Sequence, residues 1–131
     1  MVIDTSVLLA ILCDEPERHH YTELIASYPV RLLSAGSYLE AGIVLQARYG
    51  NRGVVSLKLF CTTAGIEVVS FDAETAEIAL EAYSSYGKGS HSAGLNFGDC
   101  ISYASAKRRG EPLLFKGDDF TRTDILSVTH G

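Results

Sequence analysis

The sequence has few cysteines and no long apolar run. Its three cysteines, Cys13, Cys61 and Cys100, lie far apart and form no CxxC pair. An odd, scattered set argues against a disulfide framework and against a zinc ribbon, and it fits the reducing cytoplasm. No apolar run approaches the roughly 18 residues that span a bilayer, and Met1 leads into an apolar segment without the basic start of a signal peptide. We therefore expect a cytoplasmic protein with no membrane partner.

Basic residues are also scarce. Lys and Arg number 11 against 16 Asp and Glu, which gives a net charge of −5. Proteins that bind nucleic acid through a basic face usually show the opposite balance, so composition alone does not indicate such binding. An acidic chain is compatible with a site that concentrates carboxylates around a metal ion. The 131 residues, 47% of them hydrophobic, match one globular domain, and we expect residues 1–131 to form it.

Apolar segments that read as strands alternate with segments that read as helices. This alternation predicts the α/β class, with a mostly parallel central sheet flanked by helices. Strands are predicted at 1–6, 30–34, 66–71 and 113–115, with 125–128 as a candidate last strand. Helices are predicted at 7–12, from Pro16 to 28, from Ser34 or Ser37 to about 49, at 54–63, after an Asp72 cap, and at 97–109, with a Gly-rich loop at 86–95.

Helical periodicity predicts which faces are buried. Three inward stripes follow from it: Tyr21, Leu24, Ile25 and Tyr28; then Leu39, Ile43 and Ala47; and finally Phe97, Ile101 and Ala104.

Acidic residues fall where predicted strands end or helices begin. Asp4 ends the first strand, Asp118 and Asp119 follow the strand at 113–115, Glu40 lies near the start of a helix, and Asp99 lies in the first turn of another. Ligands bind beyond the carboxyl ends of the strands in open parallel sheets, so these acids are candidates for one cluster. Each also has a local explanation as a turn former, a helix cap or a solvated helix residue.

A cluster of carboxylates without basic partners needs a cation to offset its repulsion. All-oxygen ligands select Mg²⁺, with Mn²⁺ as a possible substitute, rather than zinc. Such ions polarise a phosphoryl oxygen and activate water, which is the chemistry of phosphodiester hydrolysis.

Four segments, 1–10, 37–41, 89–100 and 113–120, resemble in order the acidic motifs of PIN-domain nucleases, and 89–100 closely resembles the third motif of the VapC toxins. The resemblance covers nearly the whole chain. It implies a PIN-like sandwich and a Mg²⁺-dependent endoribonuclease, the toxin of a type II toxin–antitoxin pair. It also implies an RNA substrate, a cognate VapB-type antitoxin that binds along the early helices, and a homodimer or a toxin–antitoxin hetero-oligomer.

The resemblance also implies residue roles. Asp4 and Asp99 would ligate the metal, and Glu40 would be a ligand or a base acting through water. Ser6, or else Thr5, would hydrogen-bond the Asp4 carboxylate.

The fourth acid is open between Asp118 and Asp119, because Gly117 stands where many members have Asp or Asn three residues before the phenylalanine. We favour Asp119, since an acid directly before the phenylalanine is the commoner family feature.

Other functions fit the sequence less well. A PIN-fold DNase would use the same acids, and a non-catalytic nucleic-acid-binding PIN module would be expected to have lost some of them. A phosphatase of the Asp-x-Asp type would need an acid at position 6, where the chain has Ser6.

Overall fold

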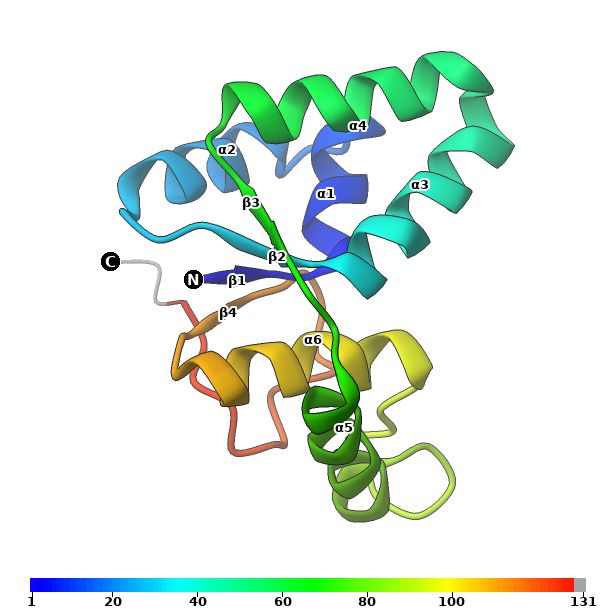
Figure 1. The fold of residues 1–131 in the computed structure, drawn as a ribbon, viewed down its shortest axis with the longest axis vertical. Coiled ribbons are helices and arrows are strands. Elements are labelled where there is room, and N and C mark those ends of the chain that lie inside the picture. Colours follow the sequence, from blue (N-terminus) through cyan, green and yellow to red (C-terminus); the bar gives the residue numbers. More distant parts are fainter. Residues whose placement is uncertain (129–131) are drawn as a thin grey trace.

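A single parallel sheet organises the computed structural model, which describes residues 1–128 (Figure 1). Its strands are β1 (Val2–Ile3), β2 (Leu32–Ser34), β3 (Glu67–Val69) and β4 (Leu113–Leu114). They lie in the order β3-β2-β1-β4, and every pairing is parallel. The predicted α/β class with a parallel central sheet is confirmed.

Helices cover both faces of this sheet. They are α1 (Thr5–Leu12), α2 (Arg18–Ser27), α3 (Ala35–Tyr49), α4 (Asn51–Thr63), α5 (Ala73–Tyr86) and α6 (Phe97–Arg109). Figure 1 shows α1 to α4 on one side of the strands and α5 and α6 on the other. The helix predicted at 7–12 begins two residues earlier because Asp4 caps it, and the one predicted at 54–63 begins at Asn51.

Alternation along the strands divides the core into two layers, because successive strand residues point to opposite faces. Ile3 packs with the α1 to α4 layer, and Val2 packs with the α5 and α6 layer. In the same way, Leu33 and Leu114 pack with the α1 to α4 layer. Leu32 and Leu113 pack with the α5 and α6 layer.

Two of the three predicted stripes needed correction. The stripe on α2 is confirmed, since Tyr21 and Ile25 are buried and Leu24 and Tyr28 pack against the same core. On α3, however, Leu39, Ile43 and Ala47 are exposed. The buried stripe there is Ser37, Ala41 and Leu45. A four-residue spacing fits more than one face of a helix, and the smaller side chains allow the closer approach.

The start of α6 and the end of the chain also differ from expectation. Ile101 and Ala104 are buried as predicted, but Phe97, at the first helical position, is 82% exposed. The candidate strand at 125–128 is reduced to a single bridge between Ser127 and Leu113.

Candidate active site

Asp4 lies where β1 ends and α1 begins, and it is 6% exposed. Its Oδ2 accepts hydrogen bonds from the Ser6 amide nitrogen at 3.0 Å and from Ser6 Oγ at 2.6 Å. This contact serves as the N-cap of α1. Thr5 does not take this role, because its Oγ1 lies 3.5 Å from the Ser37 carbonyl oxygen. Ser6 is therefore the hydroxyl that holds the carboxylate.

A third donor reaches Asp4 from the opposite layer of the fold. Ser102 Oγ, on α6, donates to Asp4 Oδ1 at 2.5 Å. Ser37 Oγ lies 3.3 Å from Ser102 Oγ, and both serines are buried. The sequence reasoning missed Ser102. A signal was present, because Ser102 follows Asp99 by three residues and such pairs share a helix face.

Asp99 is fixed by the local geometry of the α6 N-terminus. The Asn96 side chain accepts from the Asp99 amide nitrogen at 2.9 Å, and Asp99 Oδ2 accepts from the Asn96 amide nitrogen at 3.0 Å. This reciprocal pair is a capping box. Asp99 therefore does act as a helix cap, but only one of its oxygens makes the contact.

The pKa of Asp99 is raised by burial and by neighbouring carboxylates. Burial raises the pKa of Asp99 from 3.8 to about 6, against the lowering effect of the Asn96 backbone hydrogen bond. Repulsion from Asp119, Asp4 and Glu40 adds to the increase in pKa.

Glu40 reaches the same place from α3. A Cβ atom added at Gly98, in the first turn of α6, would lie 2.6 Å from Glu40 Oε2 and 2.9 Å from Oε1. Only a residue without a side chain leaves room for this carboxylate, and a helix N-terminus favours an anion. Gly98 is a second residue that the sequence reasoning missed.

The donor chemistry of this cluster fits a hard divalent cation. Within residues 1–128, none of these four carboxylates forms an ion pair with Lys or Arg. No group of three or more His, Cys, Asp or Glu side chains in that part of the chain lies close enough together to hold a metal ion. Mg²⁺ is commonly bound by one or two carboxylates with water and substrate phosphate. One or two of these acids therefore fit the donor chemistry of Mg²⁺, with water and substrate as the other ligands.

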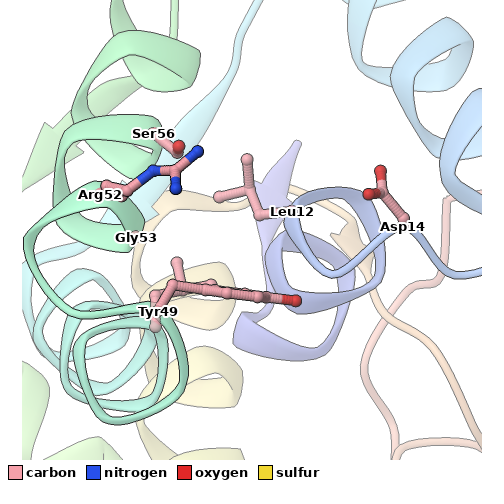
Figure 2. Close-up of a pocket in the computed structure, with 7 residues that line it drawn as sticks. Leu12, Asp14, Tyr49, Arg52, Gly53 and Ser56 are labelled. Carbon is pink, nitrogen blue, oxygen red and sulfur yellow. The ribbon is translucent and has the colours of Figure 1, made fainter.

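A separate groove lies between α1, α3 and α4 (Figure 2). It has a volume of about 350 Å³ and contains none of the candidate acids. Leu12, Asp14, Leu45, Tyr49, Arg52, Gly53 and Ser56 line it. Figure 2 shows the Tyr49 ring extending from α3 toward α1, with Arg52 and Ser56 on α4 facing the same space.

Within residues 1–128, no helix is long and apolar enough to cross a membrane.

Comparisons with known proteins bear on the family and the fold of this chain. The family model for the PIN domain matches residues 1–126. Ribonuclease VapC of Mycolicibacterium smegmatis is 51% identical over 128 residues, which cover 98% of this chain and 99% of that protein. Ribonuclease VapC30 of Mycobacterium tuberculosis is 48% identical over 128 residues, which cover 98% of both chains.

Solved structures share the fold at low sequence identity. VapC20 of Mycobacterium tuberculosis, described as a sarcin-ricin loop cleaving toxin, aligns with a TM-score of 0.79 at 22% identity over 97% of both chains. VapBC2 from Rickettsia felis, solved bound to a promoter DNA fragment, aligns with a TM-score of 0.78 at 14% identity over 98% of this chain and 96% of that one. These likenesses confirm the predicted PIN-like sandwich.

Proposed function

Because this chain belongs to the PIN-domain family, and within it to the VapC ribonucleases, we propose that it is a Mg²⁺-dependent endoribonuclease and the toxin of a toxin–antitoxin pair. The observation that carries this proposal is that α6 brings together Asp99, the Ser102 donor to Asp4, and Gly98, against which the Glu40 carboxylate lies. Such a cluster of carboxylates, without a basic partner, destabilises the metal-free fold, and a cation offsets its charge.

The position of each carboxylate indicates its proposed role. Asp4 and Asp99 would hold the metal, since both are buried at the ends of β1 and the Gly-rich loop, and each keeps its orientation through fixed hydrogen bonds. Glu40 and Asp119 would complete the site, as ligands or through water. Asp119 is favoured over Asp118 because its charge adds to the increase in the pKa of Asp99. The chain's own hydroxyls, Ser6 and Ser102, orient Asp4 and take no part in bond breaking.

Hydrolysis needs a polarised phosphoryl group and an activated water. Bound Mg²⁺ or Mn²⁺ supplies the Lewis acid and lowers the pKa of water. Glu40 would hold the cation or accept a proton from the attacking water, and its carboxylate lies beside Gly98 in the first turn of α6. The fixed carboxylates would hold the cation in place, and the cation would offset the negative charge that develops on the phosphate.

The test of the proposed substrate is incubation of the protein with total cellular RNA and with single-stranded DNA of matched length, each with Mg²⁺, followed by mapping of new ends. Discrete new RNA ends with intact DNA are expected, since the relatives are named ribonucleases. Cleavage of the DNA alone would favour the PIN-fold DNase. Intact RNA and DNA would favour the non-catalytic module.

We also propose that the groove between α1, α3 and α4 accepts an antitoxin segment. Leu12 and the exposed ring of Tyr49 give this groove an apolar surface beside the fully buried Leu45. Val55 and Leu59, on the same helix as Arg52 and Ser56, are further exposed apolar side chains on α4. An amphipathic helix is the partner that such a groove between helices fits. The antitoxin would further place a basic side chain against the acid cluster, since guanidinium pairs bidentately with carboxylates.

Titration of the cognate antitoxin against the wild-type protein and against the Asp4→Asn, Asp99→Asn double variant tests this arrangement. Weaker binding to the double variant is expected. Unchanged affinity would show that the antitoxin inhibits only by covering the site. A homodimer, a hetero-oligomer and a cytoplasmic location remain predictions, which light scattering and cell fractionation can check.

A further inference from the structure

Lys116 connects the acid cluster to the segment between α1 and α2. Its backbone amide donates to Ser6 Oγ at 3.0 Å, and that same hydroxyl donates to Asp4. Its ammonium forms ion pairs with Glu15 and with Glu17, the latter at 3.1 Å between Nζ and Oε2. One residue therefore contacts both the Asp4 support and a distant turn, 101 residues away in sequence for Glu15.

The segment that follows Lys116 has few other contacts, among them those of the Thr121 amide and Oγ1, which donate to the Asp118 carbonyl at 3.1 Å and 2.7 Å. Residues 115–119 belong to no helix or strand, and Gly117 has a φ of +97°, a conformation that favours glycine. Asp118 and Asp119 are both exposed. The next firm anchor is Phe120, which is 2% exposed and packs on Phe115 with ring centroids 5.0 Å apart. Asp119 thus lies between two anchors, the contacts of Lys116 and the burial of Phe120.

We propose that Lys116 is a positioning residue, which uses its ion pairs with Glu15 and Glu17 to fix the Asp119 turn against the Asp4 segment. The proposal rests on the proposed nuclease function for its catalytic consequence. Direct phosphate binding by Lys116 is the competing role. It is disfavoured because two carboxylates already hold the ammonium, which they would have to release before RNA is bound.

The expected effects on stability and on activity differ in size. The three side chains are between 33% and 42% exposed, and ion pairs with this exposure stabilise a fold little. A shift of about 1 Å in a catalytic group can cost up to about 100-fold in rate. Loss of the ion pairs should therefore lower catalysis far more than it lowers the melting temperature.

The experiment compares four variants: Lys116→Met, the Glu15→Gln, Glu17→Gln double variant, the triple variant that combines them, and Lys116→Arg. Lys58→Met is the matched control, because it removes an exposed lysine on α4. We expect Lys116→Met and the double variant each to lower kcat by about 10-fold with little change in KM. The combined variant should be no worse than either, because all three substitutions remove one interaction. Lys116→Arg should recover most of kcat, since guanidinium also pairs with two carboxylates.

The two candidate roles give opposite results in the Glu15→Gln, Glu17→Gln variant. A lowered KM with unchanged kcat would show that Lys116 binds phosphate once it is released, and unchanged kcat and KM would show that the ion pairs do nothing for the site. Either result overturns the proposal.

Amide hydrogen exchange of the metal-free protein provides a readout that does not depend on RNA cleavage. The amide of residue 116 donates to Ser6 Oγ, and that of Thr121 donates to the Asp118 carbonyl. Faster exchange of these two amides is expected in Lys116→Met and not in Lys58→Met, and unchanged exchange would overturn the proposal. If the wild-type protein cleaves no RNA while the exchange difference is found, the nuclease function fails and the structural connection stands.

Discussion

Substitution of Asp99 by asparagine should stabilise the metal-free protein at neutral pH. The carboxyl is 8% exposed, and its pKa is about 6 instead of 3.8. Between these values the folded protein binds more protons at Asp99 than the unfolded chain does, so stability falls as the pH rises from about 4 to about 6. The full difference corresponds to roughly 3 kcal/mol above that window. Asparagine removes this penalty because it carries no charge.

The charge-assisted hydrogen bond from the Asn96 amide is already included in this pKa, because that bond lowers it, and asparagine retains an acceptor for the amide. The net gain at pH 7.5 is therefore about 3 kcal/mol, or about 10 °C in melting temperature for a chain of this length. At pH 4.5 the penalty shrinks to about 1 kcal/mol, so the difference in melting temperature should fall to about a third of its value at pH 7.5.

Thermal unfolding followed by circular dichroism, in EDTA at pH 4.5 and 7.5, measures this difference. Asp118→Asn is the matched control, because it removes one carboxylate from an exposed position in the turn next to Asp119. A variant that melts no higher than wild type at pH 7.5 would refute the reasoning. So would an equal increase in the Asp118→Asn control.

The remaining predictions concern the residues around the cluster, and cleavage rate and melting temperature check all of them. Asp119→Ala should lower the cleavage rate more than Asp118→Ala, and the reverse order would place the fourth acid one residue earlier. Ser102→Ala removes a buried donor to a carboxylate, so it should cost about 1–3 kcal/mol in stability and lower the rate about 10-fold, whereas unchanged values of both would show the contact to be incidental. Gly98→Ala should lower the rate at least 10-fold by displacing the Glu40 carboxylate, with little loss of stability since alanine favours helix; full activity would contradict that placement.

Local patterns in the sequence predicted most of the fold. Short apolar segments predicted each strand of the described sheet. The end of α6 was predicted from Gly110 and the basic residues before it. The exposed Leu39, Ile43 and Phe97 could not be assigned this way, because periodicity gives the existence of a face and tertiary packing decides which face is buried.

The candidate site was predictable where the sheet dictates position. Asp4 lies where parallel strands end, and Asp99 opens a helix, so both positions follow from topology. Ser102 and Gly98 were not found, because their roles depend on how closely α6 approaches Asp4 and Glu40 across the fold. The choice between Asp118 and Asp119 depends on the path of an irregular turn, which local sequence does not fix.

The most direct test of the central account is cleavage of RNA by purified protein with added Mg²⁺, then with excess EDTA, then with Mn²⁺ restored, beside the Asp4→Asn and Asp99→Asn variants. The account predicts cleavage with either metal, none in EDTA, recovery on addition of Mn²⁺, and no cleavage by either variant although both remain folded. Undiminished cleavage in excess EDTA, or wild-type rates in both variants, would contradict it.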